Sequence, residues 1–77
     1  IPEHVISANE TLFEPLSERE LEVLIKIGQG YTNREIAELL YVGVSTIKKH
    51  ITHIYSKLTV DNRTQALLRA QELKLIP

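Results

Sequence analysis

Residues 32–58 read TNREIAELLYVGVSTIKKHITHIYSKL, and they contain the starts of two helices. Thr32 and Glu35 have the spacing of a capping box, which predicts a helix over 33–40. The next helix is predicted over 44–58, because its apolar residues recur at spacings of four, three and four. These residues are Ile47, Ile51, Ile54 and Leu58. Only about three residues separate the two helices, so they must cross steeply, as in a helix-turn-helix motif over about 33–52.

The flanking sequence predicts one more helix on each side of this motif. A second capping box begins at Ser17 and predicts a helix over 18–29, which Gly30 ends in a left-handed conformation. An N-cap at Asn62 predicts the last helix, over 63–73. No segment alternates as a strand would. The fold class is therefore predicted to be all-α, a four-helix helix-turn-helix domain.

The domain is expected to cover 16–77, with 1–15 as a linker or N-terminal arm. The first fifteen residues contain Pro2 and Pro15 and show no sustained helical period.

Composition narrows the class of protein. The chain has 77 residues, enough for one small domain, and it has no cysteine. No apolar run approaches the ~20 residues that span a bilayer. We therefore expect a soluble, cytoplasmic module without a membrane segment or cofactor.

Charge is distributed unevenly along the chain, although the net charge is only −1. Residues 1–40 hold eight acidic and three basic side chains, whereas 41–77 hold six basic and two acidic ones. Ordinary surface scatter could produce this difference. It also fits a molecule that turns one basic face to a polyanion.

The polar face of the 44–58 helix holds the side chains that can contact a ligand. Lys48, Lys49 and Thr52 lie away from its apolar stripe, and lysine and threonine can contact base edges in the major groove of DNA. The same face includes Ser45, His53 and Ser56. No acidic residue occurs between Val44 and Lys57, as a surface that approaches phosphates requires. The helix is therefore predicted to read double-stranded DNA.

Phosphate contacts are expected from the ends of neighbouring helices, where free amides attract anions. The residues predicted there are Thr32, Asn33, Arg34, Lys57, Asn62 and Arg63. His50 is interpreted as a half-buried residue near the groove that bonds a phosphate.

An enzyme or a metal site is not expected. His50 and His53 stand three residues apart, but no carboxylate between Val44 and Lys57 completes a metal site. No nucleophile, base and orienting group converge in the sequence.

The run from Leu16 to about Ile76 resembles the LuxR-type (GerE-like) helix-turn-helix domain of bacterial transcription regulators. The resemblance rests on several motifs in order: Leu16-Ser17-x-Arg19-Glu20, Asn33-x-Glu35-Ile36-Ala37, Ser45-Thr46-Ile47-Lys48-x-His50, Lys57-Leu58-x-Val60 and Arg63-Thr64-x-Ala66. The lead-in and the ending also look similar to large ATP-binding regulators of the MalT kind.

The resemblance implies the C-terminal domain of a longer regulator that binds DNA as a homodimer, activates transcription and has RNA polymerase as a possible partner. It implies base contacts at Lys48, Lys49 and Thr52, and it adds Thr46 to the residues near phosphates. The last helix would form the dimer contact, through Arg63, Leu67, Ala70 and Gln71.

Three positions depart from the family. Gly43 stands where serine is usual, so the cap of the 44–58 helix lacks a side-chain acceptor. Thr59 replaces a common glycine, so either the turn differs or a left-handed threonine costs stability. Thr52 is uncharged where some members carry lysine.

Two alternatives remain open. Region 4 of a sigma factor has a similar opening and also contains a helix-turn-helix motif. Against that alternative, the sequence after Lys57 predicts a whole further helix. The other alternative is a helical protein-interaction module without DNA binding, in which the acidic half of the chain meets a partner.

Overall fold

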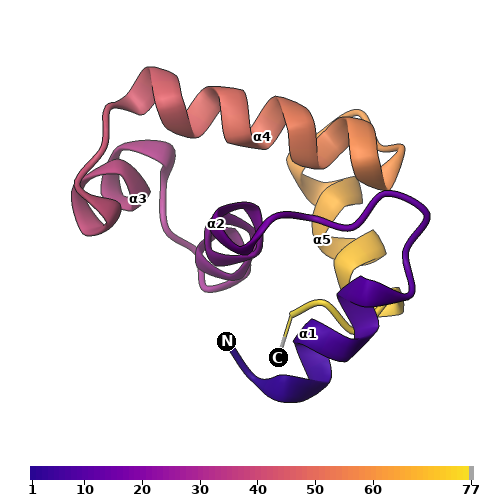
Figure 1. The fold of residues 1–77 in the computed structure, drawn as a ribbon. Helices are drawn as coiled ribbons and strands as arrows, with labels where there is room; N and C mark the ends of the chain where they lie inside the picture. The colour runs from indigo at the N-terminus through magenta and orange to yellow at the C-terminus, as the bar shows by residue number, and fades with distance from the viewer. Residues whose placement is uncertain (77) are drawn as a thin grey trace.

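The computed structural model describes residues 1–76, which form five helices and no strand (Figure 1). The helices are α1 (Glu3–Glu10), α2 (Glu18–Gly28), α3 (Asn33–Leu40), α4 (Val44–Leu58) and α5 (Arg63–Glu72). The all-α prediction is confirmed. The four predicted helices correspond to α2 to α5 and differ by one residue at two C-terminal ends.

The longest helix, α4, lies across one side of the molecule and packs on three others (Figure 1). Its predicted apolar stripe is buried, and Ile51 is the most exposed member at only 9%. Helix α2 passes beneath α4 and supplies core residues such as Leu24 and Ile27. Helix α3 also packs against α4, as does α5. The core therefore holds α4 by one face and leaves the other to solvent.

Local hydrogen bonds fix where the helices begin. The capping boxes at Ser17 and Thr32 are both present, with reciprocal side-chain and backbone bonds. The Asn62 side chain accepts from the amide of Gln65 at 2.9 Å and caps α5. At α4 the N-cap is Gly43, which provides no side-chain bond.

The four helices α2 to α5 share one kind of C-terminal end. Each is followed by a residue with positive φ: Gly30 at 93°, Tyr41 at 57°, Thr59 at 58° and Lys74 at 60°. The next amide then donates to the carbonyl five residues earlier, at 2.8 to 3.2 Å, as in a Schellman motif. The residues that donate these bonds are apolar or aromatic and pack into or against the core: Tyr31, Val42, Val60 and Leu75. Thr59 thus keeps the left-handed turn, although it lacks the freedom of glycine.

The N-terminal segment differs from the sequence expectation, because α1 lies within the predicted linker or arm. Val5 is completely buried, and Asn9 is only 7% exposed. The Asn9 side-chain amide donates to the carbonyl of Leu16, and its oxygen accepts from the Leu16 amide, both at 2.8 Å. These contacts join α1 to the start of α2.

Candidate nucleic-acid interface

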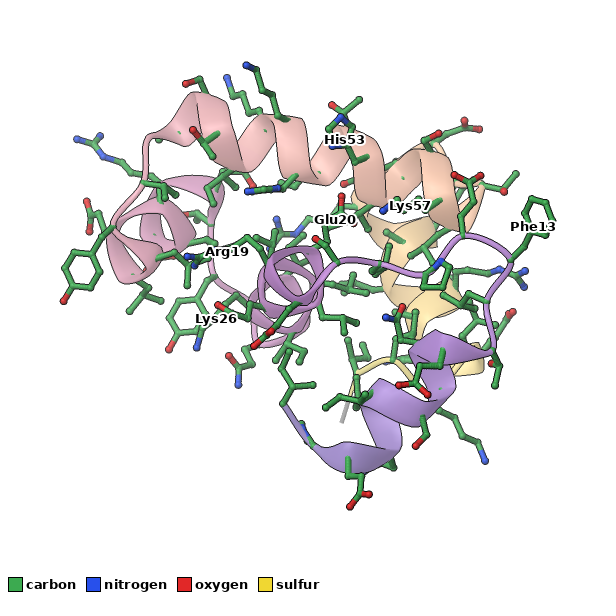
Figure 2. All side chains as sticks on the ribbon, viewed as in Figure 1. Phe13, Arg19, Glu20, Lys26, His53 and Lys57 are labelled. Atoms are coloured by element: carbon green, nitrogen blue, oxygen red, sulfur yellow. The ribbon has the colours of Figure 1, made fainter. Side chains whose placement is uncertain are left out.

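The candidate interface is the solvent face of α4. All six residues predicted for base reading or for the recognition face are exposed: Ser45, Lys48, Lys49, Thr52, His53 and Ser56. Figure 2 shows the side chains along α4, with His53 and Lys57 labelled on its C-terminal half. The face contains two lysines and no acid. It can therefore donate hydrogen bonds and attract an anionic surface.

One hydroxyl on this face is already engaged. The Thr52 Oγ1 donates to the carbonyl of Lys48, one turn earlier, at 3.0 Å. Such a bond back to the preceding turn is common for threonine in a helix. Three residues of α4 were expected near phosphates, and all three, Thr46, His50 and Lys57, are half-buried.

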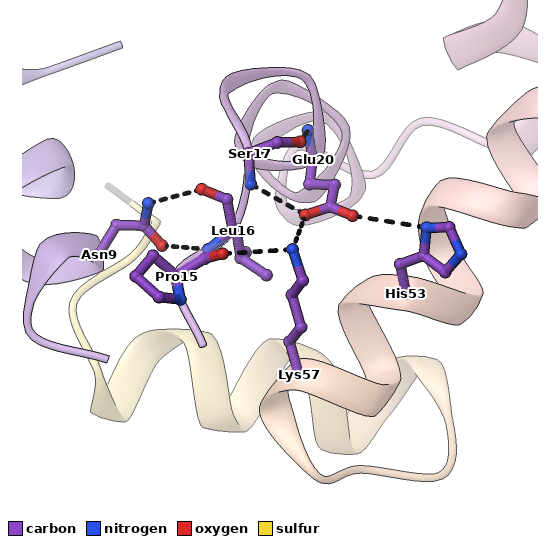
Figure 3. A network of polar contacts seen from close by, with 7 residues as sticks. All are labelled: Asn9, Pro15, Leu16, Ser17, Glu20, His53 and Lys57. Carbon is purple, nitrogen blue, oxygen red and sulfur yellow. Dashed lines mark hydrogen bonds and ion pairs between the residues drawn. The ribbon is translucent and has the colours of Figure 1, made fainter. Parts of the chain in front are cut away.

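A buried carboxylate on α2 contacts the C-terminal half of α4 (Figure 3). Glu20 is only 4% exposed. Its Oε1 accepts from the Lys57 Nζ at 2.7 Å and from the Ser17 amide at 2.9 Å. Its Oε2 lies 3.7 Å from the Nδ1 of His53, whose side chain is mostly exposed. Glu20 thus links the start of α2 to two successive turns of α4.

The surroundings of Glu20 keep it ionised. Burial raises the pKa of this carboxyl, but hydrogen bonds from Lys57 and the Ser17 backbone, together with the lysine charge, outweigh burial. The resulting pKa lies below the ordinary value. A stable negative charge on Glu20 holds the positive charge of Lys57 beside it.

Lys57 therefore has a different environment from the one expected of a phosphate-binding residue. Its Nζ also donates to the carbonyl of Pro15 at 3.2 Å, and its side chain is 25% exposed. A phosphate could use this ammonium only by sharing or replacing these partners. The sequence missed this arrangement because Glu20 is 37 residues away and has an evident local role as a cap.

The start of α3, where phosphate contacts were predicted, carries the negative charge of the Glu35 carboxylate. The Glu35 carboxylate accepts from the Thr32 amide at 2.9 Å, and hydrogen bonds from Thr32 lower the pKa of Glu35. This fixed negative charge opposes that of an approaching phosphate. Arg34 and Asn33 remain at the helix start, Arg34 exposed and 3.9 Å from Glu38, and Asn33 half-buried.

The start of α5 is tied to the turn before α3. The Arg63 guanidinium donates to the carbonyl of Tyr31 and is half-buried. Asn62 is exposed beside it while its side chain caps α5. Arg63 thus has a structural partner in addition to any phosphate it would meet.

The residues predicted for a dimer contact do not share one surface. Gln71 is exposed and Leu67 is half-buried, but Ala70 is completely buried in the core. That burial makes Ala70 inaccessible to a second chain, and this corrects the expectation for that residue. Leu68, which the sequence reasoning did not select, is 56% exposed on the same helix.

The other surfaces of the molecule gather fewer polar and charged side chains that could bind a ligand. A hollow of about 530 Å³ lies between the N-terminus, α2 and α3, and apolar side chains such as Ile25 and Leu39 form much of its wall. Within residues 1–76, no three histidine, cysteine or acidic side chains gather as a metal site would require. No helix in the same range is both long and apolar enough to cross a bilayer.

Known proteins similar to this chain agree with the geometry. The family described as bacterial regulatory proteins, luxR family, matches residues 14–70. The response regulator protein VraR of Staphylococcus aureus (strain Mu3) is 46% identical over 65 residues, which cover 84% of this chain and 31% of VraR. VraR of Staphylococcus saprophyticus has the same identity over the same length. The chain thus spans about a third of the length of these relatives.

A solved structure shows the same fold. The crystal structure of ChrA, a response regulator in a heme-sensing two-component system, superposes with a TM-score of 0.79. The two chains are 42% identical, and the match covers 94% of this chain and 36% of ChrA. The helix that follows α4 also agrees with the LuxR-type resemblance rather than with the sigma-factor alternative. The chain belongs to the luxR family of bacterial regulatory proteins and carries that family's helix-turn-helix DNA-binding domain.

Proposed function

We propose that this domain binds double-stranded DNA sequence-specifically, with α4 in the major groove. The observation that carries the proposal is the acid-free exposed face of α4, with Lys48, Lys49 and Thr52 opposite a buried stripe. Lysines at such positions can donate to the O6 and N7 atoms of guanine. The half-buried and capping residues at the helix ends would meet phosphates and set the register on the duplex.

The domain is further proposed to work as a homodimer within a longer cytoplasmic transcription regulator, and to activate transcription. A single module of this size buries little surface on DNA, so pairing two copies would add both affinity and specificity. The exposed side of α5, with Leu68 and Gln71, is the candidate contact between copies. RNA polymerase is the expected partner in activation. The domain itself is proposed to act without enzymatic activity or a cofactor.

The direct test is selection of bound sites from a pool of random duplexes, followed by affinity measurements over a range of salt concentrations. The wild-type domain is expected to enrich one motif and to bind it with a strong salt dependence. Lys49→Ala should weaken specific binding by about 1–3 kcal/mol and relax the preference at one base pair. Unchanged affinity and preference in that variant would remove Lys49 from the reading face.

A second variant distinguishes base recognition by α4 from an effect of the overall charge of the domain. Glu22→Gln changes the charge of α2 away from α4 and should leave the selected motif unaltered. Absence of any enriched motif with the wild-type domain, alone or covalently paired, would contradict the proposed function. It would favour the protein-interaction alternative.

A further inference from the structure

Thr52 differs from the lysines beside it in what its side chain can still offer a ligand. It is exposed on the same face as Lys48 and Lys49, but its hydroxyl hydrogen is directed to the Lys48 carbonyl at 3.0 Å. A hydroxyl carries one hydrogen and two acceptor lone pairs. While the bond to Lys48 persists, Thr52 can accept a hydrogen bond from a ligand but cannot donate one.

The neighbouring residues have the opposite capacity. A lysine ammonium has three donors and no acceptor, so Lys48 and Lys49 suit the acceptor atoms of a base edge. Thr52 lies about 4.5 Å further along the helix axis than Lys49, given a rise of about 1.5 Å per residue. The face therefore presents donors near the start of α4 and an acceptor one turn later.

Base edges in the major groove differ in the same property. Guanine presents only the acceptors N7 and O6, whereas adenine and cytosine each present an amino group as a donor. When docking excludes water from the Thr52 oxygen, leaving its lone pairs without a donor would cost free energy. An amino group satisfies this oxygen, and a guanine edge does not.

We propose that Thr52 is a specificity-determining residue that accepts a hydrogen bond from the amino group of adenine or cytosine. The inference rests on the proposed function, because it requires α4 to lie in the major groove. Along the exposed face of α4, Lys48 and Lys49 would then donate hydrogen bonds and Thr52 would accept one. The amino group of one adenine or cytosine should accordingly face Thr52, one or two steps from the base pair that Lys49 contacts.

The experiment uses site selection with four proteins: the wild type, Thr52→Ser, Thr52→Val and Thr11→Val. Serine keeps the acceptor, whereas valine keeps the shape and loses it. Thr11 is exposed at the C-terminal end of α1, outside α4, and its Oγ1 also donates to a backbone carbonyl, that of Ala8 at 2.7 Å, so Thr11→Val is the matched control. The position at which the Thr52→Val motif differs from the wild-type motif identifies the base in question.

Affinity is then measured on the selected duplex and on one in which that base lacks its amino group. The wild type and Thr52→Ser should lose roughly threefold to tenfold in affinity on the altered duplex. Thr52→Val should bind the natural duplex more weakly by a similar factor and should not distinguish the two duplexes. Thr11→Val should behave as the wild type does on both duplexes.

Two results would overturn the inference while leaving the proposed function intact. One is an unchanged wild-type affinity when the amino group is removed from the adenine or cytosine of the base pair that responds to Thr52. The other is an unchanged motif with Thr52→Val, together with a loss on replacing thymine by deoxyuridine, which would mean that the threonine methyl is read instead. Failure of all four proteins to enrich any motif would overturn the proposed function itself.

Discussion

Glu20 shows at the scale of single residues how one side chain can serve two elements. It closes the capping box of α2 and receives the ammonium of Lys57 from α4. Its neighbours lower its pKa in the folded state. The folded protein therefore favours the ionised form of the Glu20 carboxyl more than the unfolded chain does. Glu20 accordingly stabilises the fold whenever it is charged.

Replacing Glu20 with glutamine should lower the free energy of unfolding by about 1–3 kcal/mol, because Lys57 loses a charged partner in a partly buried place. Glu18→Gln is the control, since Glu18 is exposed at the same helix start. Urea titrations of the three proteins at neutral pH measure the difference. An equal effect of the two substitutions would show that Glu20 acts only through the general charge of α2.

The same contact predicts a pH dependence. Since the folded-state pKa of Glu20 is lowered, its contribution is complete above the unfolded-state pKa of about 4. The contribution is lost as the pH falls through the folded-state pKa. The wild type should therefore lose more stability than Glu20→Gln as the pH is lowered below about 4. Parallel curves for the two proteins would contradict the assignment.

At the scale of helices, the recurring C-terminal ends are the main feature that the sequence left undecided. Three of the four left-handed positions hold residues other than glycine, namely Tyr41, Thr59 and Lys74. A left-handed conformation costs an ordinary residue about 1–2 kcal/mol. The apolar residue that follows each turn packs on the core, and this packing offsets the cost.

Thr59→Gly should stabilise the domain by about 0.5–1 kcal/mol, because glycine removes this strain but has more freedom in the unfolded chain. Differential scanning calorimetry should show a melting temperature higher by a few degrees. Gly30→Ala is the reverse experiment. It places a side chain at a φ of 93° where no atom lies within 4 Å, so backbone strain alone should destabilise it. A lower melting temperature for Thr59→Gly would mean that the threonine side chain contributes more than it costs.

At the scale of the whole molecule, α1 depends on contacts that are distant in sequence. Asn9 bonds both backbone groups of Leu16 and is buried, so Asn9→Ala leaves those groups without partners. This substitution should reduce stability by about 1–3 kcal/mol. Its effect on DNA affinity should be small at temperatures where the domain is folded, because the Asn9 side chain bonds Leu16 and is not part of the exposed face of α4.

Ser7→Ala, on the exposed side of α1, is the matched control and should leave the melting temperature within about a degree of the wild type. Thermal unfolding and DNA titration of both variants check the prediction. A large loss of DNA affinity in folded Asn9→Ala would indicate that α1 influences the interface.

The helices α2 to α5 were predictable because their N-terminal caps and their apolar period depend on residues that are close together in the sequence. The exposed face of α4 followed from the same period. In contrast, α1 is stabilised by burial of Val5 and by the Asn9 bonds to Leu16, which no local signal specifies. The inward position of Lys57 could not be foreseen either, because its partner lies on another helix.

The pairing of Lys57 with Glu20 also bears on how the domain would search a genome. Each lysine that contacts a phosphate lengthens the residence time of the domain on DNA of any sequence, because it releases counterions wherever it binds. An ammonium already matched by a carboxylate adds little to that indiscriminate attraction. The domain would thus leave unrelated stretches of DNA sooner, and its residence time would depend more on the base edges it finds.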